Sequence, residues 1–400
     1  MKTYRLFSLL QTLSVYLVLT VFAFFMLFPF LYMFFTSFKT PADTFRYPPR
    51  LLPYDPVSAP VQGEAEPKPL YYVDVNGEPR EYALVESNIP VGVFARPENL
   101  EQTFTVPLEQ VTDTGETLNI GGEDLEVFLV DAGEGDPVPL VKLSQTALGR
   151  MVDPENPETF VLQNVRTSQP VEKLSFHPEN YSDVIALRNL DRALTNTTLV
   201  TLLVMFGQLT TSVLGGYAFA RLRFPGRDNI FTVYLGTIMI PFVVLITPLY
   251  QIMVTIGWVD RLAALIIPWI FTAYGTFLMR QFFITFPKEI EEAALIDGAS
   301  RLQILTRIIL PASTPALATL ATFTFLYAWN SFFWPLVIIN TGNEGNHVLT
   351  LALNVLRGRA ADAPNLLLAG AAIAILPPMI IFILGQRFFV ESATSSGVKG

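Results

Sequence analysis

The sequence predicts an all-α polytopic membrane protein with six transmembrane helices and a β-rich insertion on its outer side. The first observation is the composition, with 51% hydrophobic, 12% aromatic and only 15% charged residues. The second is a set of six apolar stretches, each long enough to cross a bilayer. The third is charge segregation: residues 41–193 hold 26 acidic and 11 basic side chains, whereas the rest of the chain holds 9 and 15.

Six apolar stretches are expected to span the membrane, because a spanning helix needs about 20 residues. The first follows a short basic start and exceeds the roughly 7 to 15 apolar residues of a secretory signal, so we expect a retained helix. Prolines within the later stretches predict kinks where neighbouring helices or water can satisfy the freed carbonyls. The expected spans are Leu6–Phe38, Leu194–Ala220, Ile230–Ile256, Leu262–Ile284, Pro315–Ile339 and Leu366–Val390.

Basic residues gather at alternate ends of these spans, which predicts the topology through the positive-inside rule. Both termini and the segment 285–315 should be cytoplasmic, and residues 41–193 should lie outside. The chain then divides into residues 1–40, residues 41–193 and a core of residues 194–400. The basic residues used are Lys2, Arg5, Arg221, Arg223, Arg227, Arg280, Lys288, Arg301, Arg307, Arg387 and Lys399.

The outer stretch is expected to be an acidic β-rich domain. Asn76-Gly77 lies between two alternating apolar segments, a pattern typical of a hairpin with a type I′ turn. A second hairpin is expected around Gly133 and Gly135. The many carboxylates favour solvated strands over a calcium site or a glycosidase pair, and no EF-hand spacing occurs.

The residue inventory argues against several classes of chemistry. Cysteine is absent and histidine occurs only at His177 and His347, so we expect no disulfide, no metal site and no histidine-based catalysis. No GxxxxGK[ST] pattern occurs, so the chain is not expected to bind ATP phosphates itself. We predict no catalytic residues, no cofactor and no nucleic-acid partner.

The charged segment 285–315 lies between two apolar spans and should form a helix, a tight turn and a second helix. Pro287 suits a helix start, and the acidic residues after it complement the positive end of the helix dipole. Gly298 is a natural stop. Ser300 and Gln303 form a capping box that starts a second helix, which we expect to run to Pro311. The small residues of the first helix would let another backbone approach closely.

A set of residues occurs here at fixed offsets: Glu292, Ala293, Ala294, Gly298, Ile308, Leu310 and Pro311. In these residues the segment resembles the EAA motif of permease subunits in binding-protein-dependent ABC importers. In that family the first helix docks into a cleft of the cytoplasmic ATPase subunit and couples its closure to the membrane domain. An amphipathic helix lying on lipid headgroups is the alternative that physics alone allows. The resemblance implies a coupling role for Glu292, Ala293, Ala294, Asp297, Gly298, Arg301, Ile308, Leu310 and Pro311.

Further patches are similar to the MalG-like branch, the carbohydrate-importing permeases, over residues 8–53 and 176–400. They include TSFKTPADTFRYPPRLLP, GGYAFARLRFPGR, AWNSFFWPL and the closing QRFFVESATSSGVKG. The resemblance implies the type I permease fold of ABC importers in a plasma (inner) membrane. It departs at residues 54–175, an insertion, and at Ser392, where the family's tail usually carries Gly.

The resemblance implies an importer for a sugar or oligosaccharide, with ATP hydrolysed by a separate subunit. The implied partners are a second, MalF-like permease, two ATPase subunits, an extracytoplasmic solute-binding protein and membrane lipid. A permease for another polar solute, such as a glycerophosphodiester, is an alternative, and a membrane-anchored outer sensor is an alternative of another class. A secondary transporter is disfavoured, because mid-span charges are nearly absent. The insertion could dock an outer partner or cap the spans.

Several polar or aromatic residues within the spans are candidates for the translocation path. For each one a role in tight helix packing is the competing hypothesis. The candidates are Thr247, Gln251, Tyr274, Trp329 and Asn330.

Overall fold

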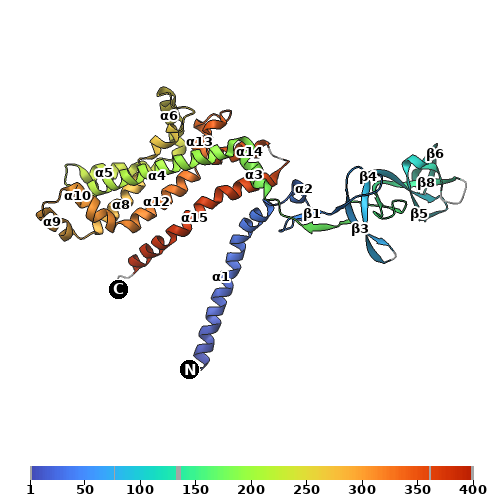
Figure 1. The fold of residues 1–400 in the computed structure, drawn as a ribbon, viewed down its shortest axis with the longest axis horizontal. Helices are drawn as coiled ribbons and strands as arrows, with labels where there is room; N and C mark the ends of the chain where they lie inside the picture. The colour runs from blue at the N-terminus through green and yellow to red at the C-terminus, as the bar shows by residue number, and fades with distance from the viewer. Residues whose placement is uncertain (1, 76, 132–136, 360–361, 398–400) are drawn as a thin grey trace. The chain divides into compact units, whose positions relative to one another are not determined.

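The computed structural model describes residues 2–75, 77–131, 137–359 and 362–397 (Figure 1). The chain forms two compact units. A helical unit comprises Met1–Pro53 with Phe176–Gly400, and a β unit comprises Tyr54–Ser175. The β unit is shorter than the range 41–193 expected for the insertion, because the short helices in residues 41–53 and 176–193 belong to the helical unit.

The helical unit is built from long helices interrupted by short ones. Brief 3-10 segments connect some of them, and a π-helix, η5 (Leu305–Ile309), precedes α11. The helices are α1 (Lys2–Thr36), α2 (Pro41–Thr44), α3 (Glu179–Ala186), α4 (Leu190–Arg221), α5 (Arg227–Gly236), α6 (Phe242–Thr255), α7 (Ala263–Ile266), α8 (Ala273–Thr285), α9 (Lys288–Ile296), α10 (Arg301–Ile304), α11 (Leu310–Ala312), α12 (Thr314–Trp329), α13 (Phe333–Ile338), α14 (Leu349–Arg359) and α15 (Pro364–Gly397).

Four helical stretches of the described residues are long and apolar enough to cross a membrane, and up to six if each of two bent pairs is one span. The four are Leu9–Thr36, Leu190–Arg221, Ala263–Thr285 and Pro364–Phe388, which overlap four of the expected spans.

One of the two bends lies within an expected span and is sharper than the kink that its prolines predicted, and the other lies at the start of an expected span. The expected span Ile230–Ile256 bends by 98° between Met239 and Phe242. Pro241 has no N–H and pushes Ile240 to an extended ψ of 114°, so the helix stops and restarts there. The expected span Pro315–Ile339 corresponds to Thr314–Ile338, which meets Arg301–Ala312 at 80°.

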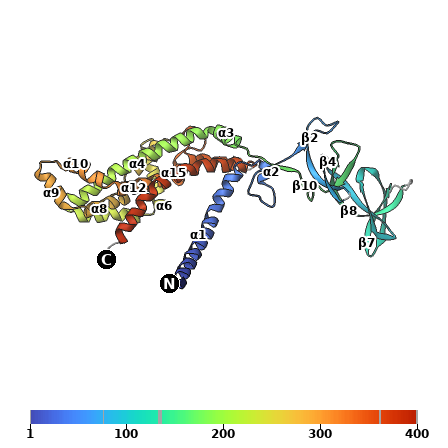
Figure 2. The same cartoon turned by 60° about the horizontal axis from the view of Figure 1, so that its bottom comes forward.

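Helix α4 is the centre of the helical unit, lying beside α8 and α12 in both views (Figures 1 and 2). Glycines allow the close packing of α4 on α8. A Cβ added to Gly216 would lie 2.8 Å from Met279 Cβ and 2.9 Å from Arg280 N, and one added to Gly275 would lie 2.2 Å from Ser212 Oγ. Small residues are the usual way for membrane helices to approach closely, because lipid supplies no hydrophobic force between them.

A break between η4 (Ile267–Trp269) and α8 leaves backbone carbonyls without helical partners. Gln208 Nε2 donates to Trp269 O at 2.7 Å, and Thr211 Oγ1 donates to Ile270 O at 2.6 Å. Thr324 of α12 in turn donates to Gln208 Oε1 at 2.8 Å. Side chains of α4 therefore replace the missing backbone bonds, as a non-helical segment at membrane depth requires.

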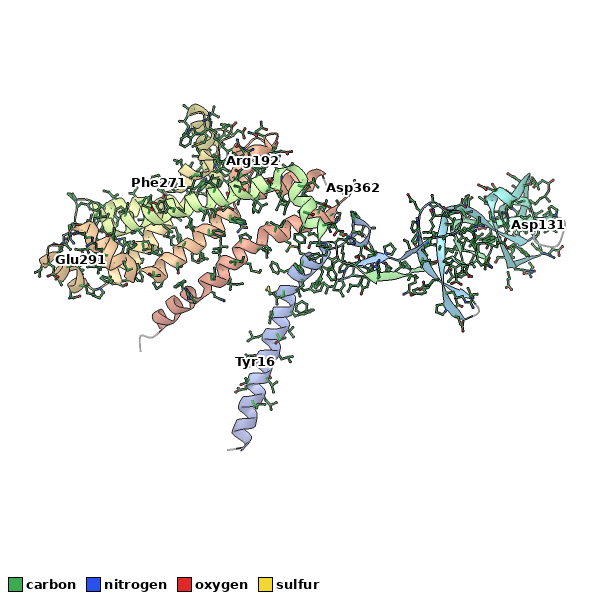
Figure 3. All side chains as sticks on the ribbon, viewed as in Figure 1. Tyr16, Asp131, Arg192, Phe271, Glu291 and Asp362 are labelled. Atoms are coloured by element: carbon green, nitrogen blue, oxygen red, sulfur yellow. The ribbon has the colours of Figure 1, made fainter. Side chains whose placement is uncertain are left out.

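The C-terminal end of α1 is held to the rest of the helical unit by polar contacts. Asn180 Nδ2 of α3 donates to Ser37 O and Lys39 O, each at 2.9 Å, and Asn365 Nδ2 donates to Asn180 Oδ1 at 3.2 Å. Burial lowers the pKa of the Lys39 ammonium, while Asp43 at 3.9 Å acts to raise it. By contrast, the most apolar part of the stretch Leu9–Thr36 in α1 is not buried by any of the described residues. Tyr16, labelled in Figure 3, lies on this helix.

The β unit consists of a large antiparallel sheet and a small two-stranded sheet formed by its first and last strands. The main sheet has the order β10-β3-β4-β8-β7-β6, with β2, β5 and β9 pairing at its sides, and β1 pairs with β11. The strands are β1 (Tyr54–Pro56), β2 (Ser58–Ala59), β3 (Lys68–Val75), β4 (Glu78–Arg96), β5 (Asn99–Pro107), β6 (Val111–Ile120), β7 (Glu123–Val130), β8 (Val138–Val152), β9 (Phe160–Gln163), β10 (Gln169–Pro170) and β11 (Glu172–Leu174).

Both hairpins expected from the sequence are confirmed. Strands β3 and β4 pair with Val75 opposite Glu78, and β7 and β8 pair with Val130 opposite Val138. Asn76 and the turn glycines Gly133 and Gly135 lie outside the described residues. The two long strands β4 and β8 carry most of the apolar core, in which Phe94 packs edge-on against Phe128 at a ring-centroid distance of 5.5 Å.

The glycine contact between α4 and α8 leads to a stability prediction. Gly216→Ala should destabilise the helical unit by about 1–3 kcal/mol, because neither Met279 Cβ nor Arg280 N can move without shifting α8. The apparent melting temperature of the detergent-purified chain should fall. Gly358→Ala is the matched control, since its Cβ would meet nothing within 4 Å and alanine favours helix. Equal melting temperatures for the two variants would contradict the close packing.

Candidate coupling site

Helix α9 is ended by its own sequence. The N–H of Ala299 donates to Ala294 O at 3.0 Å and the N–H of Gly298 donates to Leu295 O at 3.1 Å, the two bonds of a Schellman motif. Gly298 has φ +83°, a left-handed conformation that glycine adopts without a steric cost. The predicted helix stop is therefore present. No atom lies within 4 Å of the position of an added Cβ, so this chain requires glycine for its backbone angle and not for close approach.

The capping box at the start of the second helix is also present. Ser300 Oγ accepts from Gln303 N at 3.3 Å, and Gln303 Oε1 accepts from Ser300 N at 2.8 Å. The helix does not continue regularly to Pro311, however. After the short α10 the chain widens into the π-helix η5 before the α-helical α11. Such π-turns are rare and occur frequently at functional sites.

One face of α9 packs against the rest of the helical unit, and another face is exposed. Glu291 is 5% exposed and Ala294 is half-buried, whereas Ala293 is exposed. The most exposed large apolar side chains of α9 and α10 are Ile290, Ile296 and Leu302, which are 45%, 86% and 63% exposed. We call residues 285–315 the coupling segment, after the role expected for them, and these three residues its apolar face.

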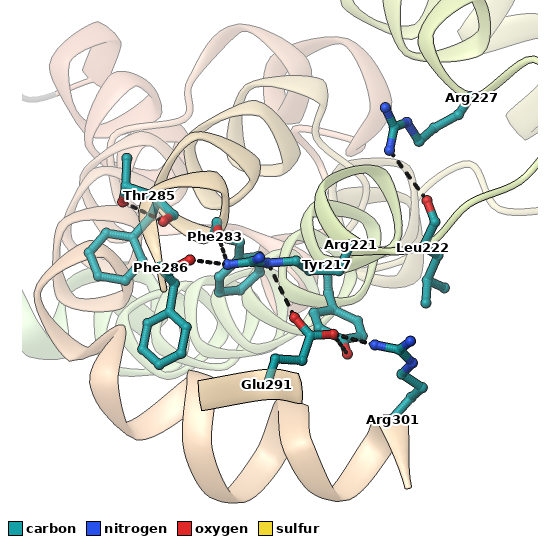
Figure 4. A network of polar contacts seen from close by, with 10 residues as sticks. Tyr217, Arg221, Leu222, Arg227, Phe283, Thr285, Phe286, Glu291 and Arg301 are labelled. Atoms are coloured by element: carbon teal, nitrogen blue, oxygen red, sulfur yellow. Dashed lines mark hydrogen bonds and ion pairs between the residues drawn. The ribbon is translucent and has the colours of Figure 1, made fainter. Parts of the chain in front are cut away.

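Glu291 is the centre of a polar network at the end of the helical unit that carries α9 (Figures 3 and 4). Its Oε1 accepts from Arg301 Nη1 and, at 3.4 Å, from Tyr217 Oη. Its Oε2 forms an ion pair with Arg221 Nε at 3.5 Å. Because removing one partner of a buried ion pair leaves an uncompensated charge, deleting the whole Glu291 side chain is expected to destabilise this end of the helical unit.

The nine residues that the motif singled out fall into three groups by exposure. Ala294, Ile308 and Leu310 pack against a buried cluster that includes Met279 and Phe283. Arg301 keeps half of its side chain exposed while contacting Glu291. The remaining five are exposed within this chain: Glu292, Ala293, Asp297, Gly298 and Pro311.

Four of the five candidate path residues are exposed and one is buried. Thr247 and Gln251 are exposed on α6, Tyr274 is exposed on α8, and Asn330 is exposed after α12. Trp329 is 4% exposed, stacks on Phe325 at 5.4 Å and donates its indole N–H to Ala374 O at 3.0 Å. Trp329 therefore lies in the packing of α12 against α15.

Sequence reasoning did not identify Glu291, Arg221 and Tyr217 as a group. Glu291 was interpreted only as one of several acids near the helix start, and Arg221 only as a topology signal. The spacing of Tyr217 and Arg221 places both on one face of α4, which is the local signal available. Among the described residues, no group of three or more His, Cys, Asp or Glu side chains could hold a metal ion.

The helical unit thus combines helices that are apolar enough to cross a membrane with an exposed helix-turn-helix at one end. The model of the family described as "Binding-protein-dependent transport system inner membrane component" matches residues 212–394. The chain belongs to this family, and the resemblance seen in the sequence is confirmed.

Curated relatives and a solved structure agree with this assignment. The sn-glycerol-3-phosphate transport system permease protein UgpE of Pectobacterium atrosepticum is 36% identical over 203 residues, covering 51% of this chain and 72% of that protein. The arabinooligosaccharides transport system permease protein AraQ of Halalkalibacterium halodurans is 36% identical over 205 residues, covering 51% and 73%. A chain of a bacterial ABC transporter involved in alginate import shares the fold, with a TM-score of 0.57, 18% identity, and 94% and 96% coverage.

The positive φ of Gly298 leads to a prediction about the turn. Gly298→Val should lower solute uptake, because a Cβ in the left-handed region costs about 1–2 kcal/mol and the two helices would reorient. Gly298→Asn should retain most of the uptake, since asparagine tolerates this conformation. Uptake would be measured in cells that carry the complete transporter, at matched membrane levels of each variant. Full activity of Gly298→Val would show that the turn geometry is unimportant.

Proposed function

We propose that this chain is a transmembrane permease subunit of a binding-protein-dependent ABC importer for a sugar or oligosaccharide. The observation that carries the proposal is the coupling segment, whose buried Glu291 fixes α9 to the helical unit while its apolar face is left exposed. Family membership supports the transporter class. The relative named for arabinooligosaccharides supports the solute class.

The partners follow from this proposal. The complex would contain two ATPase subunits, and one of them would dock on the coupling segment of this chain, where Ile290, Ile296 and Leu302 offer apolar surface and Glu292, Asp297 and Arg301 offer charge. ATP hydrolysis would reside in those subunits, since the chain has no Walker A pattern. A second permease subunit and lipid would cover the exposed apolar surface of α1, and a solute-binding protein would deliver the solute from outside.

The solute is tested by comparing two classes, because relatives are named for both arabinooligosaccharides and sn-glycerol 3-phosphate. The purified importer with its own binding protein should hydrolyse ATP faster when a saccharide is supplied than without solute. Stimulation by sn-glycerol 3-phosphate or a glycerophosphodiester alone would favour the alternative solute. No stimulation by either class would contradict an importer for these solutes, and a complex without binding protein is the control.

Six spans with both termini in the cytoplasm are part of the proposal, each bent pair being one span. The segment 285–315 would then be cytoplasmic and the insertion within residues 41–193 extracytoplasmic. The acidic β unit would dock the binding protein or cap the outer helix ends. A sensor role for this unit is disfavoured, because a membrane-anchored sensor has no use for a coupling segment.

The absence of cysteine allows a clean test of this topology. Glu101→Cys in the β unit and Asn229→Cys at the start of α5 are both exposed positions. In intact cells a membrane-impermeant thiol reagent should label Glu101→Cys and leave Asn229→Cys unlabelled. After permeabilisation both should be labelled, which controls for reactivity. The reverse pattern in intact cells would invert the orientation.

A further inference from the structure

Arg221, the last residue of α4, joins the inner ends of two helices. Its Nη2 donates to Phe283 O at 2.6 Å and also to Phe286 O. These carbonyls lie at the end of α8, where the last carbonyls of a helix lack intrahelical donors, and Phe283 O also accepts from the backbone N–H of Phe286 at 3.3 Å. A basic side chain satisfies such carbonyls and complements the negative end of the helix dipole. The ends of α4 and α8 are therefore linked through one guanidinium group.

The same guanidinium meets the coupling segment through Glu291. The Arg221 and Glu291 side chains are only 4% and 7% exposed, and Nε and Oε2 lie 3.5 Å apart. The other carboxylate oxygen accepts from Tyr217 of α4 and from Arg301 at the start of α10. One carboxylate thus contacts α4 and both halves of the coupling segment (Figure 4).

Such a pair resists sliding of one element past another. If α9 moved away from the ends of α4 and α8, the Glu291 carboxylate and the Arg221 guanidinium would each lose a partner while still buried, which is unfavourable. Small rocking of the whole assembly leaves every one of these contacts intact. The exposed Glu289, also on α9, has no such link among the described residues.

We propose that Arg221 and Glu291 are positioning residues that make α9 and the inner ends of α4 and α8 move as one body, so that motion of the docked ATPase reaches the spans. The inference rests on the proposed importer function. It assigns the transmission step to this buried pair and leaves docking to the exposed face of the coupling segment.

The test measures uptake per ATP hydrolysed in the complete transporter reconstituted in proteoliposomes. Glu291→Gln keeps the side-chain volume and removes the charge, and Glu289→Gln removes an exposed charge from the same helix as the matched control. We expect Glu291→Gln to assemble and hydrolyse ATP but to lose about tenfold in uptake per ATP. Glu291→Asp, which keeps the charge, should recover part of the ratio.

The double variant Arg221→Gln with Glu291→Gln separates positioning from folding. It removes both buried charges, so assembly should be retained, yet uptake per ATP should stay low. A wild-type ratio in either the single or the double variant would overturn the inference. Failure of both variants to assemble would also overturn it, because the pair would then act in folding alone. If the wild-type complex and Glu289→Gln show no solute-stimulated ATP hydrolysis, the proposed function itself fails.

A distance measurement tests the single-body motion directly. Spin labels on Lys288→Cys and Arg223→Cys, both exposed positions, report the separation of α9 from the end of α4. In the wild-type background the distance distribution should be the same with and without ATP. Adding Glu291→Gln should broaden it. A wild-type distance that changes with ATP would overturn the proposal even where the uptake result agreed.

Discussion

A broken helix inside a membrane is stable only if other groups replace its lost backbone hydrogen bonds, and this requirement organises the helical unit. Trp269 O and Ile270 O, at the break before α8, accept from Gln208 and Thr211. Phe283 O, at the other end of α8, accepts from Arg221. All three donors belong to α4. One unbroken helix therefore supplies the polar partners that allow its neighbour to be interrupted, and the glycines between the two bring those partners within reach.

Features encoded by adjacent residues could be predicted from the sequence. The capping box of Ser300 with Gln303, the stop at Gly298 and the hairpin that pairs Val75 with Glu78 each depend on a few neighbouring side chains. Four spans followed from apolar length alone. The bend at Pro241 was visible as a proline but not as a 98° turn, because a proline alone does not determine whether a helix kinks or stops.

Only part of the candidate site could be predicted from the sequence. Motif spacing identified residues on the exposed side of the coupling segment, but it could not show that Glu291 is buried. Its burial depends on Tyr217, 74 residues earlier in the chain, and on the approach of α4 to α9. An acidic residue in the first turn of a helix is ordinarily explained by the helix dipole, which hides such a long-range role. Trp329 is the opposite case, a residue that the sequence offered as a path candidate and that the structure buries. The sequence could not decide this, because an aromatic residue in a span is equally suited to helix packing and to lining a path.

The pairing of β1 with β11 has a consequence for how the chain acquires its structure. Tyr54 lies opposite Leu174 and Pro56 opposite Glu172, so the first and last strands of the β unit pair with each other. The β unit's own folding compensates for the entropy lost when the ends of this long segment are brought together. For the helical unit, the segment then amounts to a short connection made by β1 and β11. Folding of α1 with α3 and α15 thus becomes almost independent of the length of the sequence between them. A β unit closed by such a connection can vary in length with little effect on the packing of the helical unit.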